Sequence, residues 1–139
     1  MSQIPLAPDI FTWPSEAPQL IGGRCAACAA VTFPNQATCP RCGKSEMEVH
    51  LLARRGSLYS WTTQEFLPKE PYGGGETEET FQPYGVGLVR LGDEIKVEAR
   101  LTVGDPSRLH IDMEVELVLV PIRLDPDGTE VLTFAFQPV

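Results

Sequence analysis

The stretch Cys25-Ala26-Ala27-Cys28, followed after a ten-residue spacer by Cys39-Pro40-Arg41-Cys42, holds all four cysteines of the chain. Two residues separate the thiols of each pair, so both sulfurs of a pair can face one point from a tight turn. Two such turns brought together place four thiolates at the corners of a tetrahedron, the coordination that Zn²⁺ prefers. With all four positions filled, none stays open for water or substrate, so the metal would be structural. The spacing therefore predicts a zinc ribbon that folds around its metal.

Two other uses of the four cysteines compete with structural zinc. Iron in a rubredoxin-like electron carrier takes the same four sulfurs. Such loops usually place glycine after both pairs, but here Ala29 follows the first pair and only the second is followed by glycine, Gly43. A dedicated electron carrier also has no need of the roughly 90 residues that follow the cysteines. A disulfide or a catalytic dithiol is disfavoured, because paired cysteines of this spacing in a reducing compartment are more often metal ligands.

Composition narrows the class of protein. The chain has 139 residues, with 19 acidic and 11 basic side chains and a net charge of −8, a balance that disfavours non-specific binding to nucleic acid. Apolar residues make up 42% of the chain, yet no apolar run approaches the ~20 residues that cross a membrane. The first residues lack the basic start and long apolar stretch of a secretory signal. We expect a cytoplasmic protein that binds neither membrane nor nucleic acid.

Residues 1–19 form an N-terminal extension that carries four prolines. A long helix is disfavoured there, but Asp9 can cap one helical turn that runs through Trp13 and ends at Pro14. Phe11 and Trp13 have two possible uses. They either pack onto the core of this chain or anchor a partner chain, since exposed aromatic residues are typical of interface hot spots.

The ribbon is expected over residues 20–48. A strand at 19–24 leads into the first cysteine pair, and a strand at 31–33 leads away from it. A further strand or connector occupies residues 47–53 and carries the chain out of the ribbon.

Residues 49–139 predict a β-barrel. Residues 94–103 alternate most cleanly, with Ile95, Val97, Ala99, Leu101 and Val103 on one face. Gly92-Asp93 predicts a two-residue hairpin turn, and Pro121 indicates an edge or a bulge. Residues 67–83 are expected to form a long, mobile loop, because they combine prolines, three glycines and acidic residues. The five expected strands are 56–66, 84–91, 94–103, 114–122 and 129–136.

The fold class is therefore mainly β: an N-terminal zinc ribbon followed by a five-stranded OB-fold barrel. Five strands, one internal hairpin and a long loop after the first strand fit this topology. Periodicity alone leaves another small barrel or a sandwich open.

The residue inventory predicts no catalytic residue. Neither His50 nor His110 has a serine or spare cysteine nucleophile nearby in a motif. The glycines at 73–75 lack the lysine and helix of a phosphate-binding loop. The chain does not resemble a self-sufficient enzyme.

Five of the eleven basic residues lie close together in the sequence, beside the cysteine pairs and in the connector to the barrel: Arg24, Arg41, Lys44, Arg54 and Arg55. They are either ordinary surface charges solvated by water, or they form a positive seam between ribbon and barrel that binds a phosphate-bearing ligand. Three aromatic residues are candidates to line a partner or acyl surface, namely Trp61, Phe66 and Tyr72, although Trp61 fits the core equally well.

The order of the motifs resembles a known family. It runs from Leu20-Ile21-Gly22-Gly23-Arg24-Cys25 through Phe33-Pro34 and Cys39-Pro40-Arg41-Cys42-Gly43 to Gly56-Ser57-Leu58-Tyr59-Ser60-Trp61-Thr62 and Pro83-Tyr84-Gly85-Val86-Gly87-Leu88-Val89. This order is similar to that of the DUF35 family, OB-fold proteins associated with acyl-CoA that carry a rubredoxin-like zinc ribbon. The resemblance covers residues ~20–139. Asn35 and Gln36 depart from the frequent Phe-Pro-Pro-Arg stretch, so a phosphate contact there would need Arg24, Arg41 or Lys44 instead.

The resemblance implies a partner. Members of this family are small accessory subunits of thiolase-like enzymes, including lipid-transfer-type thiolases and aldolases, and some associate with MaoC-like hydratases. The catalytic residues then belong to the partner, and a CoA thioester is bound together with it.

We therefore expect a non-catalytic accessory subunit of a thiolase-superfamily complex in lipid or aromatic catabolism. Three alternatives remain at this point: a zinc-ribbon and OB-fold module that binds nucleic acid, an iron electron carrier, and an independent CoA-thioester hydrolase.

Overall fold

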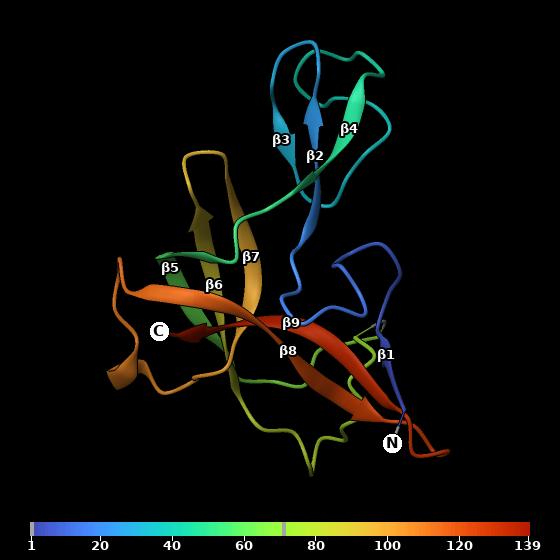
Figure 1. Cartoon of the computed structure of the whole chain (residues 1–139). Helices are drawn as coiled ribbons and strands as arrows, with labels where there is room; N and C mark the ends of the chain where they lie inside the picture. The colour runs from blue at the N-terminus through green and yellow to red at the C-terminus, as the bar shows by residue number, and fades with distance from the viewer. Residues whose placement is uncertain (1, 71) are drawn as a thin grey trace.

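The computed structural model of the chain describes residues 2–70 and 72–139, which form a small ribbon sheet standing on a larger barrel (Figure 1). The ribbon sheet has the order β3-β2-β4, and the barrel belongs to a six-stranded sheet with the order β1-β9-β7-β6-β5-β8. Within the described residues, no helix is long and apolar enough to cross a membrane.

The ribbon is built around its central strand, β2 (Ile21–Cys25). It pairs antiparallel with β3 (Val31–Thr32) on one side and with β4 (Met47–Leu51) on the other. Gly22 permits this close packing, because a Cβ there would lie 2.6 Å from the carbonyl oxygen of Thr32. The boundary predicted between residues 48 and 49 falls within β4, which pairs with β2 as far as Leu51.

The barrel closes through five strands, as predicted. β5 (Arg55–Gln64) pairs with β6 (Tyr84–Leu91), β6 with β7 (Ile95–Leu101), β7 with β9 (Glu130–Pro138), β9 with β8 (Glu114–Leu124), and β8 with β5. Only the β7–β9 pair in this circuit is parallel, and it joins two residue pairs. A 3₁₀ turn, η1 (Pro106–Arg108), lies between β7 and β8. This circuit is the OB topology.

Apolar side chains at alternate positions of the strands fill the barrel. Val97, Ala99 and Leu101 are buried as expected, whereas Lys96 and Glu98 on the opposite face are exposed. The largest fully buried side chain is Phe136 of β9. Trp61 is partly buried and packs against this core, which matches the second of its two predicted uses.

The hairpin between β6 and β7 differs from the prediction. Leu91 pairs with Ile95, so the connection has three residues, 92–94, rather than two. Gly92 still adopts a left-handed φ of 59°. The bulge predicted from Pro121 is confirmed, because the β8–β9 register shifts between Pro121 and Arg123.

The N-terminal residues contribute more to the fold than expected. β1 (Gln3–Pro5) pairs parallel with β9. β1 was not predicted from the sequence, because prolines are frequent in this segment. The helical turn predicted for residues 9–13 is wrong: Asp9 has a φ of 61°, which is not the extended conformation of a helix cap, and Phe11 forms a β-bridge with Leu20. Phe11 is buried in the core and packs onto this chain, the first of its two predicted uses.

A short neck joins the ribbon to the barrel. Leu20 and Leu52 are fully buried there, and the Leu52 N–H donates to the Leu20 carbonyl at 3.0 Å. Phe33 of the ribbon packs edge-on against Phe134 of the barrel, with ring centroids 5.6 Å apart. The ribbon and the barrel therefore share one hydrophobic core.

Replacing a core phenylalanine should test this packing. We expect Phe136→Ala to lower the free energy of unfolding by about 3–5 kcal/mol, because it leaves a cavity at the centre of the barrel. The same change at Phe66, which is 80% exposed, is the matched control and should have little effect. Urea unfolding followed by tryptophan fluorescence measures both, and equal losses would contradict the described core.

Candidate metal centre and its surroundings

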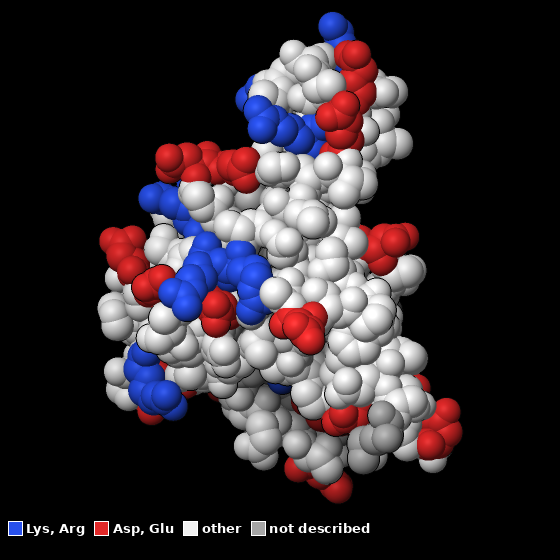
Figure 2. All heavy atoms as spheres, viewed as in Figure 1, with Lys and Arg blue, Asp and Glu red and all other residues white. Residues whose placement is uncertain are grey.

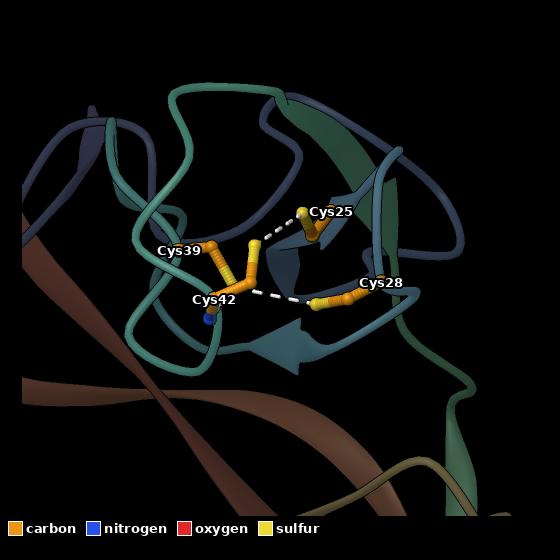
Figure 3. Close-up of side chains that lie close together, drawn as sticks. All are labelled: Cys25, Cys28, Cys39 and Cys42. Atoms are coloured by element: carbon orange, nitrogen blue, oxygen red, sulfur yellow. Dashed lines mark hydrogen bonds between the residues drawn. The ribbon is translucent and has the colours of Figure 1, made fainter.

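Two turns of the ribbon bring the four cysteines together. Cys25 ends β2 and Cys28 lies in the turn that follows it, whereas Cys39 and Cys42 lie in the loop between β3 and β4. Their sulfur atoms point toward one another across the end of the ribbon (Figure 3). All four Sγ atoms lie within 4.8 Å of one another.

The spacing of the sulfurs fits a tetrahedral metal ion. The Cys25 and Cys42 Sγ atoms are 3.7 Å apart, and those of Cys28 and Cys39 are 3.6 Å apart. With Zn–S bonds of about 2.3 Å, the edge of a regular tetrahedron is about 3.8 Å. The four thiols are positioned to hold a metal such as Zn²⁺ with no open coordination position.

The thiols of this site differ in their proton affinity. The Ala30 N–H and neighbouring side chains lower the pKa of Cys28 to about 6, outweighing the effect of burial. At Cys42 the Lys44 N–H lowers the pKa, but burial and the three other cysteines outweigh it and raise the pKa to about 11. Hydrogen bonds thus stabilise the Cys28 thiolate, whereas the other cysteines oppose ionisation of Cys42, because thiolates this close repel each other. A dication removes that repulsion.

Backbone geometry repeats around the two cysteine pairs. The Ala29 N–H donates to the Cys25 carbonyl at 2.8 Å, and the Gly43 N–H donates to the Cys39 carbonyl at 2.9 Å. Both residues are left-handed, with φ of 65° at Ala29 and 78° at Gly43. The Arg41 and Cys42 N–H groups also approach the Cys39 sulfur, at 3.4 and 3.5 Å. Ala29 in the first turn thus adopts the left-handed conformation that Gly43 adopts in the second.

The cations predicted as a positive seam have different roles. Arg41 donates to the Cys28 carbonyl and ties one turn to the other. Arg54 donates to the carbonyls of Pro18 and Leu117 at 3.0 and 3.2 Å, so it fastens the neck to the barrel. Arg55 pairs with Glu114 and Glu116.

Arg24 and Lys44 are exposed, and neither takes part in an ion pair within the described residues. In the view of Figure 2, positive groups on the ribbon and the barrel are interspersed with negative ones and do not form one continuous positive surface.

The predicted aromatic contacts also separate. Phe66 is exposed and Trp61 lies against the core, as described above. Tyr72 stacks parallel to Tyr84, with centroids 6.4 Å apart, and accepts a hydrogen bond from Arg100 at 3.0 Å. Arg123 donates to the Gly73 carbonyl at 2.7 Å. Two arginines of the barrel thus fasten the middle of the 67–83 loop.

One cluster was missed from the sequence. Arg90 and Lys96 are cross-strand partners, and both lie over the ring of Tyr59. The signal for this pair was present, because Leu91 and Ile95 both belong to the apolar face. Residues directly opposite share a face, so Leu91 had to pair with Ile95 and Arg90 with Lys96.

Comparison with known proteins gives the family. The family model described as "ChsH2, rubredoxin-like zinc ribbon domain" matches residues 16–48. The family model described as "ChsH2, C-terminal OB-fold domain" matches residues 49–120. The chain is 33% identical over 122 residues to a DUF35 domain-containing scaffold protein of Pyrococcus furiosus, covering 87% of this chain and 84% of that protein.

This chain is a member of the DUF35 family. It is also 34% identical over 134 residues to the benzoylsuccinyl-CoA thiolase subunit BbsA of Thauera aromatica, covering 95% of this chain and 86% of that subunit. Among solved structures it is similar to a chain of the Ltp2-ChsH2(DUF35) aldolase, with a TM-score of 0.62, 28% identity, and coverage of 86% of this chain and 84% of that one.

The repeated turns of this DUF35 ribbon allow a reciprocal test. We expect Ala29→Gly to relieve backbone strain and stabilise the metal-bound ribbon, and Gly43→Ala to destabilise it, each by about 1 kcal/mol. No atom lies within 4 Å of a Cβ built at Gly43, so backbone conformation is the cause rather than a clash. Competition with a zinc chelator measures both, and a loss of affinity in Ala29→Gly would contradict the strain.

The two adjacent arginines of the DUF35 neck offer a second test. We expect Arg54→Ala to lower the free energy of unfolding by about 1–3 kcal/mol, because two carbonyls lose a charged donor. Arg55→Ala is the control and should cost less, since its ion pairs are exposed to solvent. Urea unfolding ranks the two variants, and a larger loss at Arg55 would refute the assigned roles.

Proposed function

We propose that this protein is a non-catalytic accessory subunit of a thiolase-superfamily complex, a thiolase or a retro-aldolase, that acts on acyl-CoA thioesters. The observation that carries the proposal is its similarity, over 95% of its length, to a named thiolase subunit. A second BbsA, from Geobacter metallireducens, is 32% identical over the same share of the chain. In this role the chain stabilises the catalytic subunit and helps to shape its CoA and acyl site.

The chemistry of the side chains supports a non-catalytic role. All four thiols face the metal position, so none remains as a nucleophile. The His50 ring lies 3.0 Å from Glu94, which occupies its Nε2 atom, and His110 is exposed. Catalysis of C–C bond cleavage or formation therefore belongs to the partner in this proposal.

Contact with CoA is a further part of the proposal. Arg24 and Lys44 are exposed and stand beside the metal turns. Because Arg41, Arg54 and Arg55 already bind groups of this chain, Arg24 and Lys44 are the better candidates to meet the phosphates of a CoA thioester held with the partner. Phe66 is the exposed aromatic candidate for the partner or acyl surface.

A hydratase is a second candidate component of the complex. The chain is 29% identical to part of a probable enoyl-CoA hydratase alpha subunit of Thermomonospora curvata, of which it spans 32%. We place the complex in the cytoplasm, where reducing conditions keep metal-binding thiols available, and in the breakdown of lipid or aromatic acyl groups.

Native purification of the full chain tests the proposal. We expect it to copurify with a thiolase-type subunit, and we expect C–C cleavage of an acyl-CoA thioester from the complex but not from this chain alone. Mass spectrometry identifies the partner, and CoA release measures activity. A stable lone chain, or thioester hydrolysis by the isolated chain, would refute the accessory role.

A further inference from the structure

The outer face of β5, β6 and β7 has the character of an interaction surface. The inner face of these strands fills the barrel with Leu58, Val89 and Val97. The outer face carries a row along β6, the middle strand, formed by Tyr84, Val86 and Leu88, all of them half-buried. Apolar and aromatic side chains thus run along β6 on this face, and Tyr72 and Phe81 of the 67–83 loop pack against the row at its Tyr84 end.

A tyrosine and two cations mark the hairpin end of this face. Lys96 Nζ lies 4.0 Å and Arg90 Cζ lies 4.9 Å from the centroid of the Tyr59 ring. The β5–β6 register shifts at Tyr59, which remains 42% exposed. A bulge of this kind re-aims a side chain, and here Tyr59 lies beside both cations.

Arg90 and Lys96 lie near acidic residues but pair with none of them in the described part of the chain: Glu98 faces Leu88 across the same strands, and Asp93 lies in the adjoining hairpin. Arg90 and Lys96 are direct cross-strand partners, an arrangement in which like charges repel. Neither forms an ion pair anywhere in residues 2–70 and 72–139. Of the two acidic residues in the adjoining hairpin, Asp93 and Glu94, the second is engaged by His50 of the ribbon. Carboxylates from another molecule would remove the repulsion.

The opposite end of the face repeats the same chemistry. Arg100 Cζ lies 3.8 Å from the Tyr84 ring centroid, and this arginine also binds the Tyr72 hydroxyl of the fastened loop. Tyrosine and arginine are among the residues most enriched in interface hot spots. An apolar row with such a pair at each end is therefore suited to a protein partner rather than to a small ligand.

We propose that this face, centred on Tyr59, Arg90 and Lys96, is the docking surface for the thiolase-type subunit, which presents an apolar patch bordered by carboxylates. This inference rests on the proposed function. The net charge of −8 supports it, because an acidic partner surface would be repelled by most of the chain and attracted at this cation pair. Electrostatics would thus select the orientation of docking.

Charge reversal tests the surface in the assembled complex. We expect Arg90→Glu with Lys96→Glu to weaken binding of the copurifying thiolase-type subunit at least tenfold, measured by surface plasmon resonance. Lys69→Glu with Arg108→Glu is the matched control, since both residues are exposed and the charge change is identical. The control should stay within about twofold of the wild type.

Lysine labelling of the unaltered protein gives a second readout that does not depend on a variant folding. The chain has three lysines, at 44, 69 and 96. We expect acetylation of Lys96 to slow at least tenfold in the complex, relative to the free chain, while acetylation of Lys69 is unchanged.

The outcomes separate the two proposals. If the wild-type chain binds no thiolase-type subunit, the proposed function fails and this inference falls with it. If the subunit binds but both double variants bind equally, or Lys96 is labelled equally in the complex, only the docking surface is wrong. Retention of a single-stranded oligonucleotide that is lost in the Arg90 and Lys96 variant would also overturn it.

Discussion

Four sulfur atoms in one small volume are the constraint on which the ribbon depends. The Sγ atoms lie 3.6–3.7 Å apart in two pairs, and burial together with the three other cysteines raises the pKa of Cys42 to about 11. A dication turns the same crowding into the strongest attraction in the ribbon. The strands around it are too short to supply a comparable core, since β3 has two residues and β4 has five.

The ribbon is held at a defined position by the barrel rather than by a flexible linker. Leu20 and Leu52 extend the barrel core into the neck, Arg54 fastens the neck to β8, and His50 contacts the β6–β7 hairpin. The cations near the ribbon are accordingly used mostly for internal contacts. Arg24 and Lys44 on the ribbon, and Arg90 and Lys96 on the barrel, form no ion pair within the described residues.

The features predictable from the sequence were those that depend on local spacing. Cysteine spacing predicted the metal centre, and alternation in residues 94–103 predicted a strand with one buried face. The register between β6 and β7 was harder to predict, because one extra residue in the hairpin changes which side chains lie opposite each other. With a two-residue turn Arg90 would pair with Ile95, and the cation pair would not exist. β1 was not predicted because Pro5 ends it and Pro8 follows soon after, and prolines lack the N–H group that a strand donates. An edge strand tolerates proline, because one of its sides needs no backbone donor.

The final strand also sets an order of events during synthesis. β9 pairs with β1, β7 and β8, and the parallel seam to β7 rests on two residue pairs. Every other strand leaves the ribosome before β9 does, so the barrel stays open while the ribbon is already able to acquire its metal. An N-terminal unit that is complete early then stands beside a half-formed barrel with exposed strand edges. Until β9 is in place, the edges of β7 and β8 with which it pairs remain open to pairing with another chain.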